Sequence, residues 1–306
     1  MKYTSIGGVK ASRMAMGCMR IAEKPLEQTE KLIIEAVSAG VNVFDLADNY
    51  AKGDCEKVFG VAVKDIGLAR ENYMLQTKCG IRYADFGAYY DFSTEHIISA
   101  AENSLKRLKV EYLDVLLLHR PDALMQPQEV AEALERLHAS GKVRAFGVSN
   151  FSAAQMQLLE KYGVKLAVNQ MQFSLGHTLL VETGMNVNKK KSEAAVRAGE
   201  TLEYCQLKNV TMQAWSPLQY GFFEGTFLGN ESFGKLNQEL NALAEKYAVT
   251  PAAIACAWIL RHPAKMQVVT GTTSPEHMRE LCAAADVELT REEWYRLYLA
   301  TGKTLP

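Results

Sequence analysis

The sequence lacks the features that mark nucleic-acid-binding, membrane-spanning and secreted proteins. Its 306 residues include Lys+Arg 34 and Asp+Glu 35, so we expect neither nucleic acid nor an acidic membrane surface as a partner. No run approaches the about 20 apolar residues of a membrane-spanning helix. The segment 1–10 mixes charged residues with glycine and lacks the apolar region of a secretory signal.

Clustered metal ligands are missing as well. The six cysteines are scattered, and none forms a Cys-x-x-Cys pair or a zinc-binding spacing, so we expect reduced thiols in a cytoplasmic protein. A metal-dependent hydrolase using His119 and Asp45 is an alternative. Zinc requires three or four ligands, however, and the other histidines fall on predicted helices or distant loops. The sequence therefore predicts no metal site.

A glycine-rich dinucleotide motif is also missing. An open doubly wound sheet that binds a dinucleotide carries Gly-x-Gly-x-x-Gly after its first strand. The early glycines Gly7, Gly8 and Gly17 do not form this motif. The absence of this motif disfavours a doubly wound sheet, but it does not exclude a nicotinamide cofactor.

What the sequence does contain is a regular alternation of short apolar runs and longer amphipathic stretches. Strands are predicted at 13–16, 41–46, 73–77, 114–118, 144–148, 165–169, 210–214 and 267–269. Helices are predicted at 27–39, 54–66, 93–108, 128–140, 153–162, 193–206, 235–247, 251–261 and 275–284. Such repetition implies parallel strands with right-handed crossovers, and eight units in about 250 residues is the size of a (β/α)8 barrel.

Two additions flank the predicted barrel. Segment 3–10 contains Gly7-Gly8 between β-prone pieces, which predicts a β-hairpin that caps the closed end. Segment 290–300 is predicted as an extra C-terminal helix. No linker rich in proline, glycine or serine divides the chain. We therefore predict an α/β fold in which residues 1–306 form a single TIM-barrel domain.

Four polar residues follow apolar runs in this pattern. Asp45 and Tyr50 come after the second predicted strand, Lys78 after the third and His119 after the fourth. The carboxyl ends of parallel barrel strands meet at one rim, where catalytic residues from several strands converge. We therefore predict that these four side chains form a catalytic site.

The chemistry of this set favours proton delivery. A phenol titrates near pH ~10, and a nearby ammonium lowers that pKa, while a carboxylate keeps the lysine charged and fixed. Asp45, Lys78 and Tyr50 can therefore form a tuned proton donor to a carbonyl oxygen, which His119 can orient. No side chain supplies hydride, so the reaction needs a cofactor.

The later strand ends suit a nicotinamide dinucleotide. Asn150 and Gln170 carry amides that can pair with a carboxamide, and Trp215 offers a face for stacking on a flat ring. The segment 271–274 precedes a predicted helix, and its backbone N–H groups and hydroxyls suit a phosphate.

At this point the chain resembles the aldo-keto reductase family, and its bacterial cytoplasmic oxidoreductases most closely. The resemblance extends in order and spacing over essentially the whole chain. It is carried by the segments 44–50 (FDLADNY), 77–78 (TK), 118–121 (LHRP), 147–151 (GVSNF), 169–170 (NQ) and 214–218 (AWSPL).

The resemblance implies a reductase of small aldehydes or ketones, in which Tyr50 is the general acid, Asp45 and Lys78 tune it, and His119 orients the carbonyl. It implies cofactor contacts from Gly17, Cys18, Met19, Ser149, Asn150, Gln170, Trp215, Ser216, Pro217, Leu218, Gly271, Thr272, Thr273, Ser274, His277 and Glu280. NADPH is the expected cofactor and NADH the alternative. Many members carry basic residues where Gly271 and His277 stand, although Arg279 or Lys265 could substitute.

Three questions stay open at this level. The substrate is not written in the sequence, although the loops 82–91, 176–200 and 219–233 contain aromatic residues that could line its pocket. The oligomeric state is undetermined. A second reading is a nicotinamide-binding barrel that senses redox state as a regulatory subunit and turns over slowly.

Overall fold

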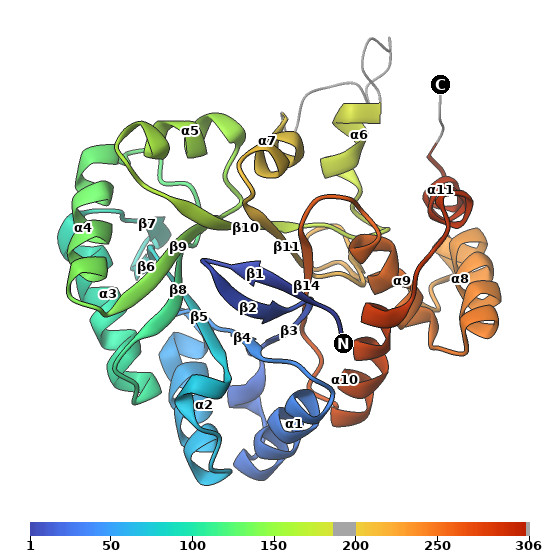
Figure 1. Cartoon of the computed structure of the whole chain (residues 1–306), viewed down its shortest axis with the longest axis horizontal. Coiled ribbons are helices and arrows are strands. Elements are labelled where there is room, and N and C mark those ends of the chain that lie inside the picture. Colours follow the sequence, from blue (N-terminus) through green and yellow to red (C-terminus); the bar gives the residue numbers. More distant parts are fainter. Residues whose placement is uncertain (186–199, 304–306) are drawn as a thin grey trace.

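Eight parallel strands close into a barrel (Figure 1). The computed structural model describes residues 1–185 and 200–303. The barrel strands are β3 (Met14–Gly17), β4 (Val43–Asp45), β5 (Met74–Cys79), β8 (Leu113–Leu118), β9 (Val143–Ser149), β10 (Leu166–Gln172), β11 (Thr211–Trp215) and β14 (Met266–Thr270). Their order around the barrel is β10-β11-β14-β3-β4-β5-β8-β9, with all neighbours parallel. The predicted (β/α)8 barrel is confirmed.

Helices cover the outside of this barrel (Figure 1). They are α1 (Leu26–Ser38), α2 (Asp54–Asp65), α3 (Thr94–Leu108), α4 (Pro127–Ala139), α5 (Ala153–Lys161), α6 (Leu179–Met185), α7 (Thr201–Leu207), α8 (Gly234–Tyr247), α9 (Pro251–Leu260), α10 (Pro275–Cys282) and α11 (Arg291–Ala300). Strands β5 and β8 are buried at all six positions, as parallel strands packed on both faces require.

Six barrel strands run one to three residues further than the sequence predicts, and in β5 and β10 the extension contains a predicted site residue. Lys78 pairs with Leu117 inside β5, and Gln170 pairs with Ser149 inside β10, so neither residue lies beyond its strand. The neighbouring strands supply backbone partners there, and pairing therefore continues past the end of each apolar run. Both side chains consequently project from rigid backbone.

The remaining differences lie in the loops. The hairpins β6 (Ile81–Ala84)–β7 (Gly87–Tyr90) and β12 (Gln219–Tyr220)–β13 (Gly225–Thr226) are not predicted, since exposed loop strands have little apolar periodicity. Of the predicted helix 193–206, residues 193–199 lie outside the described part of the chain, and α7 covers 201–207.

The amino end of the barrel is closed by the predicted hairpin, β1 (Tyr3–Ile6) and β2 (Val9–Ser12), which lies in front of the barrel in Figure 1. Ile6 is 1% exposed and packs in one cluster with residues of the strand starts, such as Val43 and Met74. Gly7 has a φ of 56°, and a Cβ there would lie 2.7 Å from the Cβ of Ala145. The turn therefore approaches the strand starts so closely that only glycine fits.

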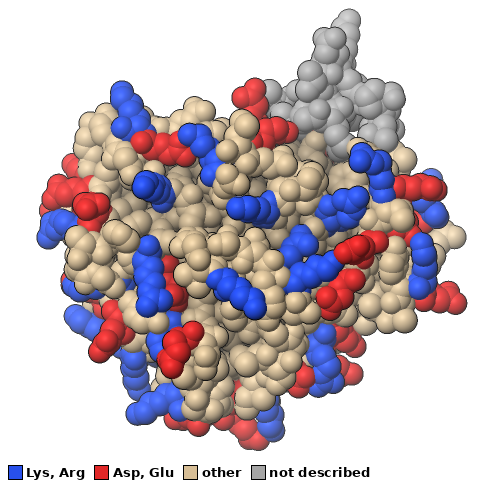
Figure 2. Space-filling view, viewed as in Figure 1, with Lys and Arg blue, Asp and Glu red and all other residues tan. Residues whose placement is uncertain are grey.

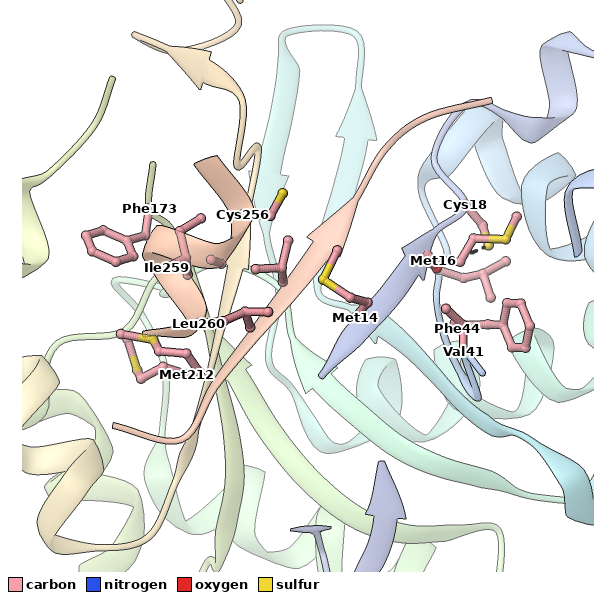
Figure 3. Packing of buried hydrophobic residues seen from close by; sticks show 14 of the residues in the cluster. Met14, Met16, Cys18, Val41, Phe44, Phe173, Met212, Cys256, Ile259 and Leu260 are labelled. Atoms are coloured by element: carbon pink, nitrogen blue, oxygen red, sulfur yellow. Dashed lines mark hydrogen bonds between the residues drawn. The ribbon is translucent and has the colours of Figure 1, made fainter. Parts of the chain in front are cut away.

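A second apolar layer joins the helices to the outside of the barrel. Figure 3 shows part of it, with Met212, Cys256 and Leu260 gathered on one side of β14. Further out, α11 docks through Trp294, whose ring stacks on Trp258 with centroids 4.7 Å apart. Burying side chains of this size contributes about 1.5–3 kcal/mol each. We infer that the chain is one domain, because this cluster joins elements from β3 to α11.

Charges of both signs lie on the face seen in Figure 2. Ion pairs tie neighbouring units together at the strand starts, with Lys142 2.6 Å from Glu102 and Arg144 3.1 Å from Asp114. In the described residues no single helix is long and apolar enough to cross a membrane. One pair of helical stretches, Glu231–Tyr247 and Pro251–Leu260, meets that requirement only when taken together, and it is bent by 91°.

Candidate active site

The carboxyl rim of the barrel opens into a cavity of about 1070 Å³. Small-molecule sites usually occupy roughly 300–1,000 Å³, so this one has room for a dinucleotide and a small substrate together. Its lining includes twelve of the residues proposed from the sequence to contact a cofactor. They are Gly17, Met19, Ser149, Asn150, Gln170, Trp215, Ser216, Pro217, Leu218, Gly271, Thr272 and His277. Glu280 makes a thirteenth, and Asp45, Tyr50 and His119 line the same cavity.

Lys78 is fully buried directly beneath this lining. Its Nζ donates to both carboxylate oxygens of Asp45 at 2.8 Å, to the backbone oxygen of Leu46 at 2.6 Å and to the Tyr50 hydroxyl at 3.1 Å. Because Tyr50 accepts from Lys78, its own O–H remains free to donate into the cavity. The structure therefore brings the acid, amine and phenol together as predicted.

Asp45 is held from below by buried amides, a contact that the sequence analysis did not predict; of these amides, only Gln170 was proposed as a site residue. Gln76 and Gln170 donate to its Oδ1 at 2.6 and 3.1 Å. Both amides also donate to Gln213, which in turn donates to Gln267. The only signal in the sequence was a glutamine within each apolar strand, since a buried amide needs partners. This network fixes the carboxylate that fixes Lys78.

Tyr50 is presented by a strained turn after β4. It begins the short 3-10 helix η2 (Tyr50–Gly53), inside which Ala51 and Lys52 have φ values of 47° and 55°. A left-handed non-glycine residue costs about 1–2 kcal/mol, so the surrounding contacts must maintain this turn. Asp48 is one anchor, because its backbone N–H donates to the oxygen of Lys78 at 3.0 Å.

The protonation states of these groups follow from burial. Burial raises the pKa of Tyr50, and the Lys78 ammonium only partly opposes this, so the expectation of a lowered phenol pKa is wrong. Burial is the largest single influence and would lower the pKa of Lys78, but the charges and hydrogen bonds of Asp45 and Tyr50 together raise it. The site therefore holds a protonated phenol and a charged amine at neutral pH.

His119 lies beside Tyr50, with the two ring centroids 5.8 Å apart. Burial, then the charges of Lys78 and Arg120, lower its pKa well below the usual range, so the imidazole is neutral. Its Nδ1 is buried and has no hydrogen-bond partner among the described residues. A proton there would be left without an acceptor, which favours the tautomer with N–H at Nε2.

A hydrogen-bonded chain of four residues forms the opposite wall. Trp215 Nε1 donates to Asn150 Oδ1 at 3.4 Å, Asn150 Nδ2 donates to Ser149 Oγ at 2.7 Å, and Ser149 Oγ donates to the backbone oxygen of Gln170 at 3.0 Å. Asn150 and Ser216 have φ values of 62° and 50°, a strained state typical of functional sites. The side-chain oxygen of Gln170 remains available to accept from a carboxamide.

The cavity also extends over the ends of β3 and β14. A Cβ at Gly17 would lie 2.8 Å from the backbone oxygen of Thr270, so only glycine keeps this floor open. Arg20 lines the cavity here and donates to the backbone oxygen of Gly271, a position that the sequence reasoning missed. Arg279 instead pairs with Glu35 at 2.6 Å. Arg20, not Arg279, therefore supplies the cation beside Gly271.

Three residues proposed for cofactor contact do not line the cavity: Cys18, Thr273 and Ser274. Cys18 is fully buried and donates to the backbone oxygen of Met16, beside Phe44 (Figure 3). Cys18 directly follows β3, and its side chain lies in the core while its neighbours Gly17 and Met19 line the cavity. Ser274 caps α10 by accepting from the backbone N–H of His277. Lys265 does not line the cavity either.

The mouth of the cavity is aromatic. Tyr83 and Tyr90 come from the β6–β7 hairpin, and Phe222 and Phe223 from the β12–β13 turn, in two of the loops proposed to shape the substrate pocket. Residues 186–199 of the third loop lie outside the described part of the chain. Within residues 1–185 and 200–303, no group of three or more His, Cys, Asp or Glu side chains could hold a metal ion.

Comparison with known proteins defines the class. The profile of the Aldo/keto reductase family matches residues 13–298, and the chain belongs to this family. Oxidoreductase YdhF of Escherichia coli (strain K12) is 35% identical over 298 residues, covering 95% of this chain and 93% of YdhF. The 6-dehydroglucose reductase of Agrobacterium fabrum is 34% identical and covers 96% of both chains. An aldo-keto reductase from Klebsiella pneumoniae, solved with NADPH, has a TM-score of 0.77 at 27% identity, covering 97% of this chain and 93% of that one.

Family membership confirms three predictions: the family itself, the TIM barrel and NAD(P)H-dependent carbonyl reduction. The chain is an oxidoreductase that acts on small carbonyl compounds. The relatives named above are reductases or oxidoreductases, so the reading as a slow redox-sensing subunit is not favoured.

Proposed function

We propose that this protein reduces an aldehyde or ketone to the alcohol, with Tyr50 as proton donor, and that NADPH is its preferred reductant. The observation that carries the proposal is the position of Lys78 Nζ, 2.8 Å from both oxygens of Asp45 and 3.1 Å from the Tyr50 hydroxyl. A buried charged amine in contact with a phenol suits the transfer of that phenol's proton to a developing alkoxide.

Each of the four catalytic residues has a separate role in this proposal. Tyr50 donates its proton to the carbonyl oxygen, and the Lys78 ammonium then stabilises the phenolate that remains. Asp45 keeps Lys78 charged and in place. Neutral His119 donates from Nε2 to the same carbonyl oxygen and orients it. A neutral imidazole orients the substrate without competing with Tyr50 as the acid.

The cofactor would occupy the part of the cavity that extends from β9 to β14. Asn150 and Gln170 would hold the carboxamide, Trp215 would lie against the nicotinamide ring, and Gly17 leaves space on the cavity floor. When bound there, the nicotinamide supplies hydride to the carbonyl carbon. The Ser216–Leu218 segment would line the pyrophosphate, and Gly271, Thr272, His277 and Glu280 would meet the adenosine end.

NADPH is proposed over NADH on two grounds. The similar Klebsiella enzyme was solved with NADPH. In this chain Arg20 lies against Gly271 and could meet a 2′-phosphate, a role that Arg279 cannot fill while paired with Glu35. Since Arg20 is exposed and a histidine, His277, stands where the family resemblance implies an arginine, NADH should also be accepted.

We further infer a cytoplasmic protein that needs no nucleic acid or membrane partner. All six cysteines are free and buried, which suits a reducing compartment. The charge is balanced over the whole sequence.

The direct test is Tyr50→Phe, assayed with NADPH and a panel of aldehydes and ketones. Removing the phenol oxygen deletes the proton donor but leaves the ring, so kcat should fall by about 10²–10⁴-fold. NADPH binding, followed by fluorescence titration, should stay within a few-fold of wild type. A variant that retains near-wild-type kcat with any accepted aldehyde would refute the assignment of Tyr50.

A further inference from the structure

Arg120 directly follows His119 at the exit of β8 and lines the same cavity. Its side chain is half-buried among aromatic rings. The guanidinium carbon is 5.8 Å from the ring centroid of Trp215 and 5.8 Å from that of Phe222. Sequence reasoning gave this arginine no role beyond its place in the LHRP segment.

The charge of Arg120 is unpaired. Two other half-buried arginines have carboxylate partners: Arg70 meets Asp114 at 2.6 Å, and Arg107 meets Glu56 at 2.6 Å. A third, Arg13, donates to the backbone oxygens of Met266 and Leu260. In the described part of the chain, Arg120 makes neither a hydrogen bond nor an ion pair with a carboxylate. Burial lowers the pKa of Arg120, but a guanidinium keeps its charge at neutral pH.

The two acidic residues that line the cavity do not compensate this charge. Asp45 is committed to Lys78 and the buried amides. Glu280 belongs to α10, which follows β14. In the barrel order β8 and β14 are separated by three strands in either direction, so they stand on opposite sides. Arg120 is therefore a lone cation on the side of the cavity away from the proposed adenosine end.

A desolvated charge without a partner is unfavourable, and a guanidinium is well suited to bidentate contact with an oxyanion. We propose that Arg120 binds a carboxylate or phosphate group on the substrate, so that the enzyme prefers anionic aldehydes or ketones over neutral ones. This inference rests on the proposed carbonyl reduction.

Arg120 and the arginine proposed to bind the cofactor phosphate lie on different sides of the barrel. Arg20, at the β3–β14 side, is the cation placed to meet a cofactor phosphate, whereas Arg120 adjoins His119, where the carbonyl would bind. The anionic group of the substrate would then point toward Trp215 and Phe222. Arg120 therefore acts on substrate selection.

The test compares matched charged and neutral substrates with saturating NADPH: 4-carboxybenzaldehyde against benzaldehyde, and glyceraldehyde 3-phosphate against glyceraldehyde. We expect kcat/KM of wild type to favour the charged member of at least one pair by tenfold or more. The pair that shows the preference identifies carboxylate or phosphate as the recognised group. Most of the preference should appear in KM and weaken at high salt.

Arg120→Gln should reduce the charged-to-neutral ratio of kcat/KM by about 10–100-fold, because it removes the charge and keeps a polar side chain. Arg120→Lys should lie between, since it keeps the charge without the fork. Arg82→Gln is the matched control: Arg82 is on the β6–β7 hairpin and is already paired with Asp91 at 2.7 Å. Its ratio should equal that of wild type. NADPH titration confirms that each variant is folded.

Three results would overturn the inference. A wild-type ratio near one in both pairs, with benzaldehyde still reduced, rejects anion recognition and leaves carbonyl reduction standing. An unchanged ratio in Arg120→Gln assigns the preference to another group. A weaker NADPH affinity that accounts for the whole loss in Arg120→Gln places Arg120 in cofactor binding. Failure of wild type to reduce any of the four aldehydes refutes the proposed function itself.

Discussion

The two ends of this barrel differ in the kind of side chain that they bury. At the amino end, apolar side chains from the hairpin and the strand starts fill the interior, and ion pairs such as Lys142–Glu102 stay in solvent. At the carboxyl rim, the polar side chains of Lys78 and Asp45 are buried, and backbone strain appears at Ala51 and Asn150. Backbone strain is therefore present where the cavity opens, around the proposed site residues.

The contrast indicates that the closed end mainly stabilises the fold, whereas the rim mainly carries the proposed chemistry. Hydrophobic contacts at the closed end gain free energy without restricting which groups face the cavity. Buried charges at the rim gain little net stability, because desolvation offsets their attraction. They gain position and fixed protonation state, which the proposed proton transfer requires. Substitutions at the two ends should therefore separate stability from activity.

Lys78→Met is expected to have the largest effect. It leaves Asp45 buried without its cation, which should cost about 3–5 kcal/mol of unfolding free energy and abolish measurable carbonyl reduction. Urea unfolding and NADPH-dependent turnover measure the two quantities. Lys142→Met is the control at the other end, where an exposed pair contributes about 1 kcal/mol or less. Similar losses of unfolding free energy and turnover in the two variants would show that the two ends of the barrel do not differ in this way.

Ile6→Ala should show the reverse pattern. It empties space between the hairpin and the strand starts, and buried isoleucine-to-alanine changes cost about 2–5 kcal/mol. The melting temperature should fall, while kcat and KM at 25 °C stay near wild type, since no cavity residue moves. A tenfold lower kcat in the folded variant would show that packing at the closed end also affects catalysis at the rim.

Asp48 offers a pH-dependent test within the rim. Burial, then the charge of Glu56, raise the pKa of Asp48 to about 7. Between its unfolded value near ~4 and about 7, the folded protein holds a proton that the unfolded chain has lost, so stability falls as pH rises through this window. At ~1.4 kcal/mol per pKa unit, the loss is about 2–4 kcal/mol.

Asp48→Asn should remove that fall, because an amide does not titrate. Urea unfolding at pH 4.5 and pH 8 compares the variant with wild type, which cancels the contributions of other groups. The variant should gain stability relative to wild type as pH rises. Parallel stability curves across this range would show that Asp48 is already ionised in the folded protein.

The smallest expected effect concerns cofactor choice. Arg20→Gln should weaken NADPH binding about tenfold and leave NADH binding nearly unchanged, the size expected for one charge-assisted contact with a phosphate. Arg279→Gln, at an arginine paired with Glu35, should change neither. Fluorescence titration of both cofactors decides. If wild type preferred NADPH over NADH by several thousandfold, recognition of the 2′-phosphate could not depend on one exposed arginine.

Much of this could be predicted from the sequence, because period and position are local signals. Short apolar runs gave the eight strands, and polar residues at their ends gave Asp45, Tyr50, Lys78 and His119. The direction of the Tyr50 pKa could not be predicted, since it depends on how deeply a loop residue is buried. The role of Gln213 could not be predicted either, because its hydrogen-bond partners Gln76 and Gln170 lie far from it in the sequence.

The six buried thiols have a practical consequence. Burial raises the pKa of every cysteine, from Cys18 in the barrel to Cys282 at the end of α10, so each stays protonated and shielded from reagents. A thiol-labelling reagent can then react only when the local structure opens. The rate at which each cysteine is modified becomes a site-by-site record of breathing motions, obtained without introducing any label or mutation.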